Sequence, residues 1–266
     1  MGLSIGAKGP AVATLQRRLK SAGATLADDG VFGPKTDKAL RRYQRQHDLV
    51  ADGIFGPKTE AAFNDAPAPA TLTHADIRAA AKKLDVDVPA VLAVNEVESR
   101  GAGFDGHRPV ILYERHIMRR RLAAHSLDAR GAATDHPKLV NKQPGGYAGG
   151  AAEWMRFNRA AAIDRASAIE ATSWGLFQIL GQHWQRLGYD SADDYAAHMR
   201  DSEAAQLSAF VAFIQTDDTL AQALASHDWA TFAATYNGPN YAQNDYDHNL
   251  AAAWRRHGGQ TAGNVA

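Results

Sequence analysis

The chain has no cysteine among its 266 residues, which excludes disulfide bonds, thiolate metal ligands and a cysteine nucleophile. No apolar run reaches the roughly 18 residues that a membrane-spanning helix needs. The first residues, MGLSIGAKGP, lack the basic and apolar regions of a cleavable export signal. We therefore expect a soluble protein, made without an export signal, that does not insert into a membrane.

Net charge is absent too, because 29 Lys and Arg balance 29 Asp and Glu. Residues 1–66 hold ten basic against seven acidic side chains. This bias either helps a weak approach to a negatively charged surface or reflects ordinary solvated faces. No dense basic stripe indicates nucleic-acid binding. The eleven His are scattered without H-E-x-x-H, and G-x-S-x-G is missing, so we expect no metal, no other cofactor and no serine nucleophile.

One eight-residue phrase occurs twice, as DGVFGPKT at residues 29–36 and DGIFGPKT at residues 52–59. Asp-Gly favours a turn, and the proline of each copy suits the first turn of a helix. An earlier helix is indicated from Pro10 to Gly23 by apolar residues at helical spacing. We expect two turn-plus-helix units on a shared core, with Phe32 and Phe55 in equivalent positions.

This stretch, with GAKGPAVATLQRRL ahead of it, resembles the three-helix peptidoglycan-binding module found on many cell-wall hydrolases. The resemblance implies that cell-wall glycan or stem peptide binds in a groove between its helices. Alternating Ala and Pro in NDAPAPATLT favour an extended linker. We therefore divide the chain into a binding module at 1–64, a linker at 65–72 and a second domain at 73–266.

The second domain is predicted to be mainly helical with a minor β element. Helix starts are indicated at Thr73, Ser191 and Ser202, each followed by apolar residues three or four apart. One strand is predicted, from Val110 to Tyr113. The Gly-rich stretch from Leu139 to Trp154 lacks phosphate-binding spacing, and we expect a mobile lip there.

The segment PAVLAVNEVESRG, residues 89–101, predicts a helix that is apolar on nearly every side and therefore buried. Glu98 falls on a different face from Glu96, so the two do not form a pair. Apolar neighbours and the helix dipole at its last turn should raise the pKa of Glu98, as a general acid requires. Alternatively, Glu98 is a structural residue paired with Arg100 or Arg108.

Three stretches occur in order: Glu98-Ser99, SWGLFQI at 173–179, and ATYNGPNY at 234–241. They are similar to the signatures of the goose-lysozyme and soluble lytic transglycosylase superfamily. VESRGAGF followed by RPVILYERHIM resembles, more narrowly, the N-acetylmuramidase domain of modular phage endolysins. The resemblance implies a lysozyme-like fold with Glu98 as the catalytic acid. It also implies that four residues surround Glu98 and bind sugars: Ser173, Gln178, Tyr236 and Asn237.

A second catalytic group is less defined by the sequence. Glu114, where the predicted strand gives way to a helix, and Asp105 are the candidates for activating water, with Glu114 preferred. Without such a group, the muramic acid 6-hydroxyl could attack instead, as in lytic transglycosylases. Tyr236 could also be a core aromatic, because Trp229, Phe232 and Tyr236 form a helical stripe.

The resemblance implies a peptidoglycan hydrolase that cleaves between N-acetylmuramic acid and N-acetylglucosamine. It further implies an endolysin that accumulates in the host cytoplasm until lysis. We expect a monomer whose partner is bacterial peptidoglycan. The alternative from another class is a wall-binding protein that has lost its activity.

Overall fold

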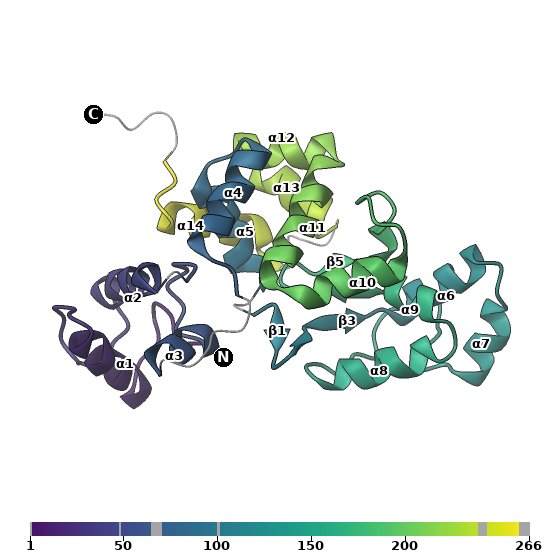
Figure 1. Cartoon of the computed structure of the whole chain (residues 1–266), viewed down its shortest axis with the longest axis horizontal. Helices are drawn as coiled ribbons and strands as arrows, with labels where there is room; N and C mark the ends of the chain where they lie inside the picture. The colour runs from purple at the N-terminus through teal and green to yellow at the C-terminus, as the bar shows by residue number, and fades with distance from the viewer. Residues whose placement is uncertain (1, 48, 65–70, 100–101, 239–243, 261–266) are drawn as a thin grey trace. The chain divides into compact units, whose positions relative to one another are not determined.

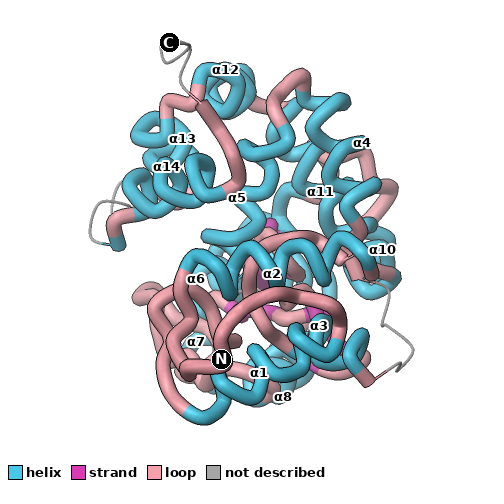
Figure 2. Tube along the Cα trace, turned by 90° about the vertical axis from the view of Figure 1, so that its left-hand side faces the viewer, coloured by secondary structure: helices cyan, strands magenta, loops and turns pink. Residues whose placement is uncertain are grey.

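The computed structural model describes residues 2–47, 49–64, 71–99, 102–238 and 244–260, and most of them are helical (Figure 2). Their contacts define two compact units: Met1–Gly101 with Ala223–Ala266, and Ala102–Gln222. The prediction of a mainly helical chain with few strands is confirmed. Within the described ranges, every helix falls short of the length and apolar character that crossing a bilayer would take.

The elements described in the first unit are helices, with isolated β-bridges between Leu3 and Phe55 and between Lys8 and Val31. These helices are α1 (Pro10–Ser21), α2 (Pro34–Gln46), α3 (Pro57–Phe63), α4 (His74–Leu84), α5 (Val88–Ser99), α12 (Asp218–Ser226), α13 (Trp229–Tyr236) and α14 (Tyr246–Arg256). Helix α12 begins in the last residues of the second unit. Both α4 and α14 pack against α5, and α13 packs on α14 (Figure 1). The helix predicted to carry the catalytic acid is therefore a central element of this unit.

The second unit combines helices with two small antiparallel sheets. Its elements are β1 (Phe104–Asp105), β2 (Arg108–Pro109), β3 (Ile111–Tyr113), α6 (Arg115–Ala124), α7 (Ala129–Asp135), α8 (Ala152–Ala161), α9 (Arg165–Glu170), β4 (Thr172–Trp174), β5 (Ile179–Leu180), a 3₁₀ turn η1 (Gly181–His183), α10 (Ala192–Asp201) and α11 (Glu203–Gln215). The predicted strand is β3, whereas β4 and β5 were not predicted. SWGLFQI is too short to show strand alternation. Helix α8 begins inside the stretch predicted as a loop.

The predicted helix starts are confirmed, and each has a capping side chain. Thr73 forms a capping box with Asp76 at the start of α4. Ser191 and Ser202 accept hydrogen bonds from the backbone at the starts of α10 and α11. Of the predicted linker, residues 65–70 lie outside the described residues, and the boundary between binding module and second domain stays a prediction.

The two copies of the repeated phrase build the same turn, and a buried glutamine holds each one. Nε2 of Gln16 donates to Asp29, to the Val31 carbonyl and to Thr36 at 2.9–3.0 Å, while its Oε1 accepts from Gly30 N.

Gln44 repeats this pattern on Asp52, the Ile54 carbonyl, Thr59 and Gly53 N at 2.7–3.2 Å. The phrase therefore recurs because each turn supplies the same four groups to one amide. Phe32 is fully buried in the shared core, whereas Phe55 packs against its edge.

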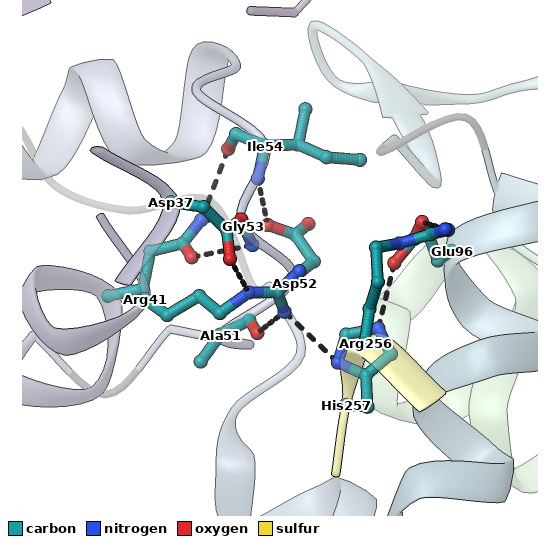
Figure 3. A network of polar contacts seen from close by, with 10 residues as sticks. Asp37, Arg41, Ala51, Asp52, Gly53, Ile54, Glu96, Arg256 and His257 are labelled. Carbon is teal, nitrogen blue, oxygen red and sulfur yellow. Dashed lines mark hydrogen bonds and ion pairs between the residues drawn. The ribbon is translucent and has the colours of Figure 1, made fainter. Parts of the chain in front are cut away.

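A polar network joins the second copy to α5 and α14 within the first unit (Figure 3). Arg41 donates through Nη1 to the Ala51 carbonyl at 2.6 Å and lies 3.0 Å from Nδ1 of His257. Because a guanidinium only donates, Nδ1 accepts and the ring proton is on Nε2. That nitrogen lies 2.8 Å from Oε2 of Glu96, which also pairs with Arg256.

Replacing Gln16 or Gln44 with alanine should lower the free energy of unfolding of the full chain by about 2–3 kcal/mol. Each change leaves buried donors and acceptors without partners. The matched control is Gln46→Ala, on the same helix as Gln44 but exposed, and it should change stability by less than about 0.5 kcal/mol. Urea denaturation measures all three, and equal losses would contradict the assignment.

Glu96 should make stability depend on pH. Burial opposes its ionisation, but His257 and Arg256 outweigh burial and lower the pKa of the Glu96 carboxyl below its ordinary 4.5. A lowered pKa stabilises the fold above about pH 4.5, and that contribution is lost as the pH falls through the folded value. The stability difference between wild type and Glu96→Gln should therefore shrink between about pH 6 and pH 3. A difference independent of pH would argue against this pairing.

Candidate active site

Glu98 lies in the last turn of α5, after a stretch that is closed off from solvent. Residues 90–95 are all buried, as the apolar pattern predicts. The Glu98 side chain is half-buried, and its Oε1 accepts a hydrogen bond from Nδ2 of Asn237 at 2.9 Å. The acid of the first signature and the amide of the third are thus in direct contact, although far apart in sequence.

Glu96, two residues earlier on α5, is held by one arginine and one histidine. Arg256 and His257 contact its two carboxyl oxygens, and together they hold the pKa of this carboxyl low in spite of its burial. A carboxyl group kept ionised in this way is poorly suited to donate a proton near neutral pH. Glu96 and Glu98 have different partners, as their helical spacing predicts. Of the two arginines considered as partners of Glu98, Arg100 lies outside the described residues.

Asn237 follows the last residue of α13, a helix that Asp228 caps by accepting from Thr231 N at 3.1 Å. Nδ2 of Asn237 donates its hydrogen bond to Glu98. Its Oδ1 is buried and has no hydrogen-bond partner among the residues that the structure describes. A buried acceptor in this state is uncommon, because most buried polar atoms are paired.

Tyr236 is half-buried, and its ring stacks on Phe232 with centroids 5.4 Å apart. This contact agrees with the helical stripe, while the residue as a whole keeps partial exposure to solvent. Sugar binding by Tyr236 stays a prediction. Residues 239–241, the end of the third signature, lie outside the described residues.

In the second unit, Ser173 lies on the more open face of the sheet β3-β4-β5. It pairs across the sheet with Leu112 and Leu180, and all three are half-buried. The flanking residues Trp174 and Ile179 point into the core and are buried. Strand alternation therefore places the Ser173 hydroxyl away from the core.

Gln178 closes the turn between β4 and β5 with a positive φ of 49°. Its Nε2 donates to the Gly175 carbonyl at 2.8 Å, so the amide nitrogen stabilises the turn. Gly175 has φ +71°, and an added Cβ would collide with the Gln206 side chain. The glycine of SWGLFQI is therefore needed for the close approach of Gln206.

Gln206 was not singled out from the sequence, although it is fully buried and holds this turn. Its Oε1 accepts from Leu176 N at 2.7 Å, and its Nε2 donates to the carbonyls of Met199 and Gly103 at 3.0 and 3.3 Å. A polar residue in the first turn of the otherwise apolar helix α11 was the signal that could have identified it.

Glu114, the preferred second carboxylate, directly precedes α6 and accepts from the Tyr147 hydroxyl at 2.9 and 3.0 Å on its two oxygens. Nδ1 of His116 lies 3.2 Å from Oε2. Burial and the contact with Glu114 raise the pKa of Tyr147, so the phenol remains a neutral donor. Asp105, the other candidate, is exposed at the β1–β2 hairpin.

Glu153 is a second residue that the sequence did not reveal. It is fully buried and accepts from Ala148 N, Gly149 N and Arg156. Burial opposes its ionisation, but these donors hold the pKa of Glu153 below its ordinary value. The loop that carries Tyr147 is thereby fastened to α8. The predicted mobility of this loop is not tested here, and it stays a prediction.

The family of the chain follows from comparison with known proteins. Residues 87–258 match the N-acetylmuramidase family, and residues 8–63 match the peptidoglycan binding domain family. The crystal structure of a Burkholderia AP3 phage endolysin superposes with a TM-score of 0.89 at 50% sequence identity, over 96% of this chain and 97% of that one. No match is found among the curated proteins. The buried helix, the three signatures and these matches agree that the chain belongs to the N-acetylmuramidase family and is a lysozyme-type peptidoglycan hydrolase with a peptidoglycan-binding domain.

Proposed function

We propose that Glu98 is the general acid that protonates the oxygen between N-acetylmuramic acid and N-acetylglucosamine as the β-1,4 bond breaks. The observation that carries this proposal is the hydrogen bond from Asn237 to Oε1 of Glu98. The neutral amide of Asn237 orients the carboxyl group and itself adds no positive charge, which would favour the ionised form. Glu96, whose pKa its partners Arg256 and His257 hold low, is unsuited to the same step.

Asn237 has a second role in this proposal. With Nδ2 engaged by Glu98, its buried Oδ1 is left to accept from the substrate. The N-acetyl groups of both sugars carry an N–H donor that suits such an acceptor. One side chain would thus orient the acid and bind the sugar beside it.

The other sugar contacts are proposed for Ser173, Gln178 and Tyr236. Hydroxyl and amide groups hydrogen-bond sugar hydroxyls, and an aromatic face packs on the apolar side of a sugar ring. Since Nε2 of Gln178 is bound to its own turn, its Oε1 is the group left for substrate.

Glu114 is proposed to activate the water that completes hydrolysis. A carboxylate offers about four lone-pair positions, and Tyr147 uses only part of them. The alternative is a lytic transglycosylase reaction, in which Glu114 only positions Tyr147. Mass spectrometry of the digest separates the two, because the anhydro product is lighter by one water than the hydrolysis product.

We further propose that the protein acts as a phage endolysin, as the name of its structural neighbour suggests. In that role it remains in the host cytoplasm until the membrane is breached and then binds and cleaves the wall as a monomer. A binding-only protein is the rival from another class. A clear zone in a peptidoglycan zymogram would exclude it.

Glu98→Gln should fold normally and reduce kcat on peptidoglycan by about 1,000-fold, because a general acid contributes on this scale. Glu96→Gln is the matched control on the same helix. It should lower stability but retain kcat within about threefold when assayed well below its melting temperature. Release of soluble muropeptides measures both, and comparable losses in the two variants would refute the assignment.

Asn237→Asp places a second carboxylate against Glu98. A like charge should raise the pKa of the acid, so that Glu98 stays protonated to higher pH and the alkaline limb of the kcat profile moves up by about one pH unit. Asn249→Asp adds the same charge on the exposed face of α14 and serves as control. An alkaline limb shared by Asn237→Asp and wild type would show that Asn237 does not act on the acid.

A further inference from the structure

Positive charge is concentrated in one part of a chain that is neutral as a whole. Residues 115–165 contain ten Lys and Arg against four Asp and Glu. All of them belong to the second unit, which also carries Glu114 and the sheet β3-β4-β5. Binding of sugar hydroxyls does not require this charge, because the glycan backbone itself is mostly uncharged.

Four of these cations line one surface hollow of about 710 Å³. The lining is both cationic and apolar. It comprises the cations Arg115, Lys138, Arg156 and Arg159, the apolar residues Leu139, Ala148, Ala152 and Met155, and Gly146 and Asn158. None of these described lining residues is acidic. Met155 is 67% exposed, which is unusual for a large apolar side chain.

Arg156 has an unsatisfied group at this hollow. Its Nη1 donates to the Tyr113 carbonyl at 3.0 Å and to Oε2 of Glu153 at 2.7 Å. Its Nη2 is buried and lacks a hydrogen-bond partner within the described part of the chain. Only 11% of the side chain is exposed, so neither water nor a ligand in the hollow readily reaches that nitrogen. Arg156 therefore contributes to the hollow through its charge, which one carboxylate, Glu153, offsets.

The other cations add charge without a matching anion. Arg115 holds the loop through bonds to the carbonyls of Gln143 and Pro144, both at 2.9 Å. Lys138 and Arg159 are exposed, and no ion pair is found for either among the described residues. When Glu153 is counted against Arg156, three positive charges remain around the hollow.

We propose that this hollow binds the carboxylates of the stem peptide of peptidoglycan. The hollow is far larger than a small inorganic anion needs, and its lining combines four cations with apolar side chains. Several carboxylates on short aliphatic side chains match that combination, and the stem peptide is the part of the wall substrate with this chemistry. The inference rests on the proposed function, in that peptidoglycan is the substrate.

The hollow is connected to the candidate site by contacts inside the second unit. Arg156 bonds the carbonyl of Tyr113, the residue before Glu114, and its Cζ lies 6.0 Å from the ring centroid of Tyr147. Ala148, which lines the hollow, follows the tyrosine that bonds Glu114. A peptide bound here would therefore help to position the glycan against the group proposed to activate water.

The test compares two substrates and two charge-matched variants. The substrates are solubilised glycan strands with their stem peptides and the same strands after removal of the peptides by an amidase. Lys138→Gln/Arg159→Gln removes two cations from the hollow. Arg120→Gln/Lys142→Gln removes two exposed cations of the same unit that do not line it.

Wild type should show a KM about tenfold lower for peptide-bearing strands than for stripped strands. The hollow variant should lose this preference, whereas the control variant should keep it. If both variants raise KM equally, or if wild type has no preference, the proposal is overturned in favour of general charge attraction.

A binding measurement separates this inference from the catalytic assignment. The tripeptide L-Ala-γ-D-Glu-diaminopimelate should bind Glu98→Gln protein in an NMR titration, with shifts at residues 138–159, and binding should weaken at least about fivefold with Lys138→Gln/Arg159→Gln. Absence of binding, or binding only to vesicles of anionic lipid, would overturn the proposal even if Glu98 proves to be the acid. If the tripeptide binds but Glu98→Gln still lyses peptidoglycan, the result would support peptide binding in the hollow and refute Glu98 as the general acid.

Discussion

The hydrogen bond between Asn237 and Glu98 is the contact on which the proposed chemistry of this muramidase depends. A carboxyl group that must deliver a proton has to be held in place, and holding it with a cation would make it give up the proton too early. Two glutamates on the same helix, α5, differ in this respect. Glu96 pairs with Arg256 and bonds His257, which contributes to the fold, while Glu98 accepts from the neutral amide of Asn237 and is the proposed acid.

The same arrangement ties the binding module to the helix that carries the acid. Through Arg41 and His257, the second copy of the repeated turn is connected to Glu96. The two copies are alike in their glutamine bonds but not in their surroundings. Hydrogen bonds from Val31 N and Gln16 lower the pKa of exposed Asp29, whereas burial raises the pKa of Asp52. One copy thus remains open to solvent, and the other is part of a larger polar network.

In the second unit, buried polar side chains take the place of regular secondary structure. The strands β4 and β5 are too short to hold the turn between them, so Gln206 supplies the missing bonds. The loop after α7 likewise depends on Glu153 and Arg115. Because each of these groups is bonded, irregular backbone can present Tyr147 and Gln178 in defined positions. The same loop borders the cationic hollow. The bonds of Glu153 and Arg115 therefore hold both Tyr147 and one edge of the proposed peptide site.

The sequence by itself determined what depends on neighbouring residues. Proline and glycine positions predicted the helices of the binding module. Ser and Thr caps predicted the starts of α4, α10 and α11. Apolar residues on nearly every side of α5 predicted that this helix is buried. The signatures of a known superfamily indicated Glu98 and its companions. Their roles in the reaction remain proposals.

Only the tertiary structure decided which polar groups meet. Three such contacts join residues far apart in the chain: Asn237 bonds Glu98, Arg256 and His257 hold Glu96, and Gln206 holds the turn between β4 and β5. The cationic hollow likewise draws its lining from α6, α8 and the loop between α7 and α8. Helical and strand periodicity reports which face a residue occupies, but not what lies opposite that face. Which polar groups pair across long sequence distances is therefore decided only by the packing of the helices and strands.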